Sequence, residues 1–82
     1  MEQYTLVRST GPADDGEERG LLFLSRDIDA VFLAAKREAI REFAKQVRLS
    51  DHPGAVEIGA TEFGYDILEG PRPLVRLIIA AI

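Results

Sequence analysis

The chain contains one pair of side chains suited to general-base chemistry, Asp51 followed by His52. His52 is the only histidine among the 82 residues, and there are no cysteines. An Asp–His pair acts as a general base only when a nucleophile or a substrate pocket lies beside it. Here the pair lies in a run of helix-breaking residues immediately before Pro53. We therefore expect a structural or solvated role for His52, no catalytic residues, and a protein that is not an enzyme.

A second group of reactive side chains is an acidic patch in the glycine-rich segment from Thr10 to Gly20. Its members are Asp14, Asp15, Glu17 and Glu18. Their spacing lacks the alternating oxygen ligands, the central glycine in register and the closing glutamate of a calcium-binding loop. The glycines are not followed by the Gly-Lys-Ser/Thr of a phosphate-binding loop. We expect no metal and no cofactor here, and we interpret the segment as a solvated hairpin loop with carboxylates available to a partner.

A third group is a basic stripe on a predicted helix. It consists of Arg37, Arg41, Lys45 and Arg48. At about 100° per residue these side chains fall within about 80° of one another, opposite the predicted core face. Glu38 and Glu42 flank the stripe and are expected to pair with Arg41 and Lys45. The stripe fits either an ordinary solvated helix face or a contact surface for phosphate or for acidic side chains.

The helix that carries the stripe is predicted from Ser25 to Leu49, the only long segment with helical periodicity. Its predicted core face consists of Ile28, Val31, Phe32, Ala35, Ala39, Phe43 and Val47, widened by Leu33 and Ile40. Ser25 is the expected N-cap, because its hydroxyl can accept an amide hydrogen bond from the first turn. The breaker cluster from Ser50 to Gly54 ends the helix.

The remaining apolar segments predict strands. They are Gln3–Ser9, Leu21–Leu24, Ala55–Thr61, Tyr65–Glu69 and Leu74–Ile82. The last segment could form a helix, but its isoleucine and valine content favours a strand whose Val75, Leu77 and Ile79 face the helix. Val56 and Ile58 are expected in the same core. The sequence thus predicts one α+β domain over residues 1–82, in the order ββαβββ, with one helix packed on an antiparallel sheet of four or five strands.

Two aromatic residues flank Gly64 in a predicted turn between strands. Phe63 and Tyr65 could anchor a partner, because exposed aromatic residues often do so. In a small domain, aromatic residues beside a turn more often fold back and cover the end of the sheet. We favour this second interpretation for both residues.

Charge and composition limit the classes of function. The net charge is −4, yet the segment Arg26–Leu49 carries six basic and four acidic residues, or +2, which leaves −6 for the rest. A general nucleic-acid binder is more often basic overall. No signal-peptide pattern opens the chain, and the apolar segment Leu74–Ile82 is too short to span a bilayer. We expect a cytoplasmic protein without membrane contact.

These observations favour a non-catalytic module that acts stoichiometrically by binding a protein or a protein–nucleic-acid complex. In layout alone, the chain resembles the small, acidic anti-CRISPR proteins of phages, which block nucleic-acid sites on a nuclease. The layout is also similar to that of HicB-type antitoxins. Neither resemblance rests on a residue motif, so neither assigns site residues. The alternatives are direct binding of nucleic acid through the basic stripe and action as a HicB-type antitoxin. The chain could also associate as a homodimer.

Overall fold

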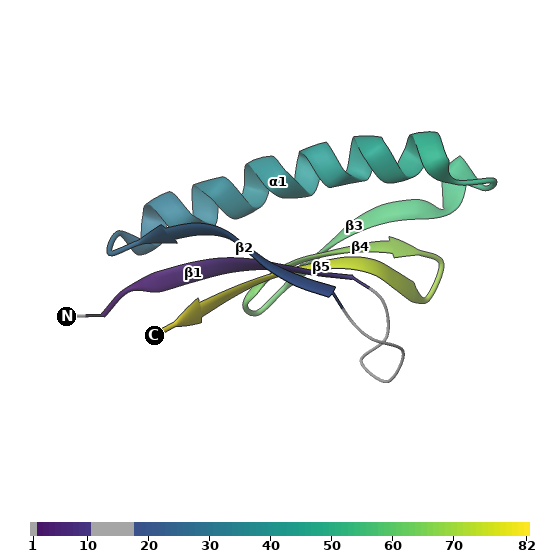
Figure 1. The fold of residues 1–82 in the computed structure, drawn as a ribbon. Coiled ribbons are helices and arrows are strands. Elements are labelled where there is room, and N and C mark those ends of the chain that lie inside the picture. The colour runs from purple at the N-terminus through teal and green to yellow at the C-terminus, as the bar shows by residue number, and fades with distance from the viewer. Residues whose placement is uncertain (1, 11–17) are drawn as a thin grey trace.

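The computed structural model describes residues 2–10 and 18–82 and confirms the predicted α+β architecture (Figure 1). A hairpin of β1 (Tyr4–Thr10) and β2 (Glu18–Ser25) precedes the long helix α1 (Ile28–Leu49). A short 3-10 turn, η2 (Pro53–Ala55), leads into β3 (Val56–Thr61), β4 (Gly64–Glu69) and β5 (Arg72–Ala81). The strands form one five-stranded antiparallel sheet, and α1 lies along one of its faces.

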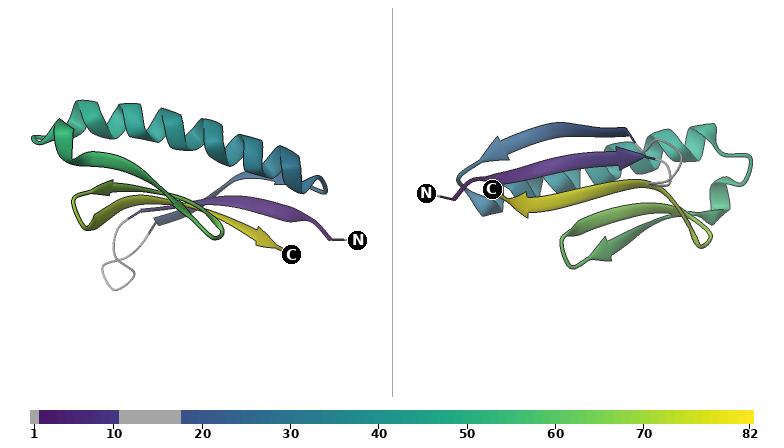
Figure 2. Two further views of the ribbon diagram at one scale, coloured as in Figure 1. Left: turned by 180° about the vertical axis from the view of Figure 1, so that it is seen from behind. Right: turned by 60° about the horizontal axis from the view of Figure 1, so that its bottom comes forward.

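The last strand of the chain lies in the middle of the sheet. The strand order is β2-β1-β5-β4-β3, so β5 pairs with β1 on one side and with β4 on the other. The two ends of the chain therefore lie side by side (Figure 2). They are joined by a hydrogen bond of 2.8 Å from the Ile82 amide to the Gln3 carbonyl. The prediction that the C-terminal segment forms a strand is confirmed, and this strand is interior, while β2 and β3 form the two edges.

Two residues separate the end of β2 from the start of the helix. Asp27 is the N-cap, and its Oδ1 accepts hydrogen bonds from the amides of Asp29 at 3.0 Å and Ala30 at 3.4 Å. The predicted N-cap, Ser25, is therefore wrong, because β2 continues through this residue. The Ser25 hydroxyl instead accepts the Asp27 amide at 3.0 Å, which supports the turn from strand into helix.

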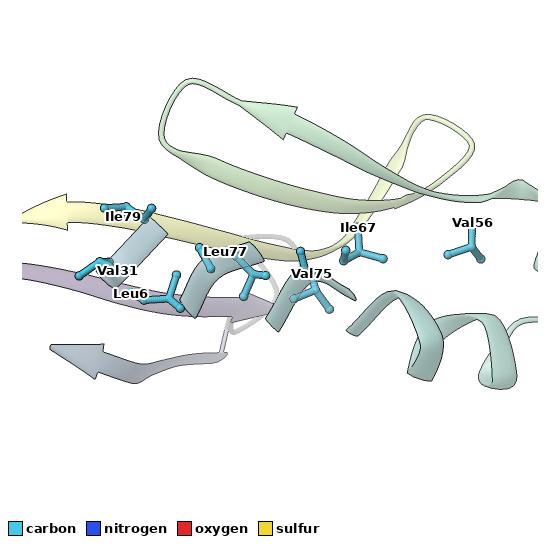
Figure 3. Close-up of a cluster of buried hydrophobic side chains, with 9 residues drawn as sticks. Leu6, Val31, Val56, Ile67, Val75, Leu77 and Ile79 are labelled. Carbon is cyan, nitrogen blue, oxygen red and sulfur yellow. The ribbon is translucent and has the colours of Figure 1, made fainter. Parts of the chain in front are cut away.

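The core is a single row of aliphatic side chains between α1 and the sheet (Figure 3). The buried residues of this row are Leu6, Val31, Ala35, Ala39, Val56, Ile67, Val75, Leu77 and Ile79. Alternation along β5 points Val75, Leu77 and Ile79 toward the helix, as the sequence predicted. The small Ala35 and Ala39 let the helix approach the sheet closely.

The predicted rotation of the helix is partly wrong. Val31, Ala35 and Ala39 are buried, but Ile28 and Phe32 are each 40% exposed. The face that meets the sheet is turned away from these two residues and instead includes Glu42, which is 7% exposed. Leu33 and Ile40, expected to widen the core face, are also exposed. The predicted core residue Ile58 is exposed too, because it lies on the edge strand β3, where only Val56 is buried.

We expect Leu6→Ala to destabilise the protein by about 2–5 kcal/mol, because Leu6 is fully buried in this row. Leu33→Ala removes the same atoms from a side chain that is 50% exposed, so its effect should stay below about 1 kcal/mol. Urea unfolding of both variants measures the two free energies. Equal losses of stability would contradict this placement of the core.

Gly64, at the start of β4, has a backbone that no other residue fits. Its φ is +150°, and an added Cβ would lie 1.9 Å from the carbonyl oxygen of Leu77 on the neighbouring strand. This close approach lets the β3–β4 turn bring the Phe63 carbonyl to the Ile79 amide, at 2.7 Å. The glycine between the two aromatic residues is therefore required by the central strand pairing.

Gly64→Ala should therefore destabilise the fold by about 3 kcal/mol or more, through backbone strain and the clash with β5. Gly54→Ala provides the control, because a Cβ at Gly54 meets nothing within 4 Å. That variant should change stability by less than about 1 kcal/mol. Thermal unfolding followed by circular dichroism distinguishes the two, and a stable Gly64→Ala protein would contradict the geometry of this turn.

Candidate interaction surface

The edge strand β2 exposes four consecutive large apolar residues. Leu21, Leu22, Phe23 and Leu24 are 61%, 42%, 38% and 46% exposed, and they account for four of the twelve exposed large hydrophobic residues of the described chain. Scattered exposed apolar residues are normal on a protein surface, but a contiguous group is not. The sequence predicted this strand but not its exposure, which depends on its place at the sheet edge.

A β-bulge divides these four side chains between the two faces of the sheet. Leu6 pairs with Phe23 and Val7 pairs with Leu21, so Leu22 is an extra residue without a partner in β1. Phe23 shares the helix-facing side with the buried Leu6. Leu21 and Leu24 pair with Val7 and Thr5 and lie on the opposite, open face, over which no described helix or strand packs (Figures 1 and 2).

A shallow groove of about 160 Å³ runs between β2 and α1. Its floor and strand side are formed by Leu6, Leu22 and Phe23, and its helix side is formed by Ala34, Arg37, Glu38 and Arg41. A second depression, of about 240 Å³, lies beside Leu22 and is lined by Arg8, Arg19 and Gly20. The helix-facing side of β2 is therefore apolar at its base and bordered mainly by arginines.

All four residues of the predicted basic stripe are exposed. Arg37 and Arg41 lie on the flank of the helix next to β2, since both line the groove there. Arg41 donates to Glu38 at 2.8 Å, which confirms that predicted pair. Arg37 makes no ion pair with any other described residue.

Glu42 does not form its predicted pair with Lys45. It points from the helix toward β1, where its Oε1 accepts a hydrogen bond of 2.7 Å from Nε of Arg8. Its side chain is 9% exposed, and its Oε2 is buried with no hydrogen-bond partner among the described residues. Position 42 continues the spacing of Ala35 and Ala39, so that spacing was the signal that could have placed it on the buried face.

Two opposing effects act on the pKa of Glu42. Burial alone would raise the pKa of this carboxyl, because it disfavours the charged form. The hydrogen bond and positive charge of Arg8, with smaller contributions from Lys45 and Gln46, outweigh burial and lower the pKa below its ordinary value. The ionised Glu42 is therefore the form that the fold favours, and Arg8 is the main reason.

The other candidate residues are not brought together. Asp14, Asp15 and Glu17 lie outside the described residues. For Glu18 the structure describes only the backbone, which starts β2 opposite Thr10. Asp51 and His52 are exposed in the turn after the helix, where the His52 amide donates to the Ser50 hydroxyl at 2.9 Å. Ser50 in turn hydrogen-bonds Glu69, so this turn fastens the end of the helix to β4.

The two aromatic residues beside Gly64 have different surroundings. Tyr65 is half-buried and packs against the core, as favoured by the sequence. Phe63 is 61% exposed, so the prediction that it covers the sheet is wrong. Within residues 2–10 and 18–82, no cluster of three or more His, Asp or Glu residues could hold a metal ion. The same part of the chain contains no helix long and apolar enough to cross a membrane.

Because of the buried pair of Arg8 and Glu42, we expect the stability of the fold to depend on pH. Because the pKa of Glu42 is lower in the folded than in the unfolded chain, its ionisation stabilises the fold above about pH 4.5, and this contribution is lost as the pH falls through the folded-state value. Arg8→Ala leaves the buried carboxylate unpaired and should cost about 1–3 kcal/mol at pH 7.

The difference between wild type and Arg8→Ala should shrink below pH 4.5, since protonated Glu42 no longer needs the arginine. Arg41→Ala breaks an exposed pair and should cost less than about 0.5 kcal/mol at either pH. Urea unfolding at pH 7 and pH 3.5 provides the comparison. A cost for Arg8→Ala that is the same at both pH values would show that the carboxylate is not its cause.

Comparison with known proteins adds no assignment to this surface. No family model, curated protein or solved structure matches the chain. The features of the chain that bear on its function are the exposed strand β2, the groove above it and the arginines that border the groove.

Proposed function

We propose that this protein acts stoichiometrically, without catalysis, by binding another macromolecule through β2 and the adjacent flank of α1. The observation that supports the proposal is that Leu22 and Phe23 are exposed beside Arg37 and Arg41, while Leu21 and Leu24 of the same edge strand are exposed on its other face. A contiguous apolar surface with a polar rim is typical of sites that bind other proteins. Arginine is also frequent among the residues that dominate binding energy.

The partner that we favour is a protein or a protein–nucleic-acid complex. The apolar residues of β2 require a partner surface that can exclude water from them, which protein surfaces provide. The finer proposal is an inhibitor that occupies the nucleic-acid site of its partner, as in the anti-CRISPR proteins that the layout resembles. In a HicB-type antitoxin, the partner would instead be a toxin.

A second candidate function is direct binding of nucleic acid through the basic stripe. Its support is that Arg37, Arg41, Lys45 and Arg48 are all exposed, so each could reach a phosphate. Two observations make it the weaker candidate: Arg41 is already paired with Glu38, and the chain carries a net charge of −4. Phosphate contacts would also leave the apolar residues of β2 unused.

The proposal predicts that the protein forms a complex of fixed stoichiometry that depends on Arg37 and Arg41. A tagged protein would be cross-linked in the cells that naturally make it, and the partner identified by mass spectrometry. Binding would then be measured by titration calorimetry with the two purified proteins. Arg37→Glu/Arg41→Glu should weaken binding at least about tenfold, because both arginines border the proposed contact and the variant reverses their charge.

The matched control is Lys36→Glu/Arg72→Glu, which changes the net charge by the same amount at two exposed positions outside the groove. It should bind like the wild type, and circular dichroism should show both double variants folded. A gel shift with DNA and RNA tests the second candidate, since phosphate binding weakens steeply as salt rises. Saturable turnover of a substrate, or the absence of any fixed-ratio complex, would overturn the proposal.

A further inference from the structure

We infer that β2 binds an extended segment of the partner as a sixth, antiparallel strand whose side chains alternate between acidic and apolar. This inference rests on the proposed function, since it specifies how the partner is recognised. Three observations support it: the open edge of the sheet, the different chemistry of the two faces of β2, and the charges around the groove.

The backbone of β2 provides the first observation. One side of this strand pairs with β1 from Ser25 to Glu18, and no described strand pairs with the other side. An edge strand presents a row of unpaired N–H and C=O groups, to which an extended peptide can add. The opposite edge, β3, is a poorer acceptor. It is shorter, and its only exposed large apolar residue is Ile58.

The two faces of β2 specify the side chains of the added strand. Successive side chains of a strand point to opposite faces, and a new strand lies about 4.8 Å from its neighbour. On the open face it meets Leu21 and Leu24, which calls for apolar residues. On the helix side it lies next to Leu22 and Phe23, below Arg37 and Arg41. Long acidic side chains there can bury their methylene groups in the groove and reach the guanidinium groups.

The charges around β2 favour a different protein over a second copy of this chain as the molecule that binds this strand. The groove is lined by Arg37, which makes no ion pair with a described residue, and by Arg41, which pairs with Glu38. The depression beside it is lined by Arg19 and by Arg8, whose charge is balanced by Glu42. Two copies paired antiparallel through β2 would be related by a two-fold axis perpendicular to the sheet. Both helices would then lie on one face, with Arg37 and Arg41 of each copy directed at those of the other. Charge complementarity therefore favours an acidic segment over self-pairing.

The test uses three synthetic heptapeptides with blocked ends. The first alternates glutamate and valine, the second alternates lysine and valine, and the third is the acidic peptide with proline at its central position. Titration into the isotopically labelled protein, followed by amide NMR and hydrogen exchange, should show binding of the acidic peptide. It should bind at least about tenfold more tightly than the lysine peptide. The amides between Arg19 and Ser25 that face outward should become protected.

The proline peptide separates strand addition from attraction by charge alone, because it keeps all the acidic groups but loses a backbone donor. It should bind at least about tenfold more weakly than the acidic peptide. Arg37→Glu/Arg41→Glu should reverse the preference in favour of the lysine peptide. Equal binding of the acidic and proline peptides would overturn the inference, as would the absence of binding by the acidic peptide.

Two protein variants locate the contact. Leu21→Glu and Phe63→Glu replace apolar side chains that are each 61% exposed, the first on β2 and the second at the tip of the β3–β4 hairpin. Only Leu21→Glu should weaken the binding of the acidic peptide. Sedimentation velocity of the wild type should show a monomer. A dimer that Leu21→Glu dissociates would instead identify the occupant of β2 as a second copy, and would overturn the inference.

The natural partner distinguishes failure of this inference from failure of the proposed function. If the purified partner forms a fixed-ratio complex that Leu21→Glu leaves intact, strand addition at β2 is wrong while the proposed function stands. If no macromolecule forms such a complex, the proposed function fails as well. Loss of the complex in Leu21→Glu but not in Phe63→Glu supports both.

Discussion

One helix must cover a five-stranded sheet, and the rest of the structure follows from this constraint. A helix of 22 residues is about 33 Å long and about 10 Å wide. Five strands are about 19 Å across, so the helix can bury only a band of the sheet. It connects one edge strand to the other and contacts all five strands on the way (Figure 1). The margins of the helix-facing side and the whole opposite face are left without a covering element of the described chain.

The ion pair between Arg8 and Glu42 determines which face of the helix meets the sheet. Both groups belong to the interface between α1 and β1, and Glu42 follows Ala35 and Ala39 on the face that meets the sheet. A buried carboxylate is tolerated there only because the arginine supplies a charge and a hydrogen bond. A rotation of the helix that buried Phe32 more deeply would separate the pair. The polar contact and the small alanines together select a helix rotation that the larger apolar side chains alone do not.

The helix rotation and the strand order explain which parts of the structure could be predicted from the sequence. Periodicity located the helix and the alternation on β5, because both patterns are local and have a fixed period. The rotation of the helix was predicted from hydrophobicity, so Ile28 and Phe32 were placed inside and Glu42 outside. The exposure of Leu21–Leu24 could be predicted only with knowledge of the strand order, because an apolar run has the same sequence pattern in a central strand and in an edge strand. Arg37 and Arg41 were identified from their spacing, but their position beside β2 is a tertiary feature.

An exposed apolar edge strand favours self-association unless something opposes it. In this chain two features act against pairing of β2 with its own copy. The bulge at Leu22 interrupts the regular spacing of the edge, and Arg37 and Arg41 place positive charge above it. Neither feature excludes a different strand that follows the bulge and carries carboxylates on the helix side. If a partner strand adds at this edge as proposed, the arginines would oppose strands of their own charge and favour acidic ones, between which a purely apolar edge could not distinguish.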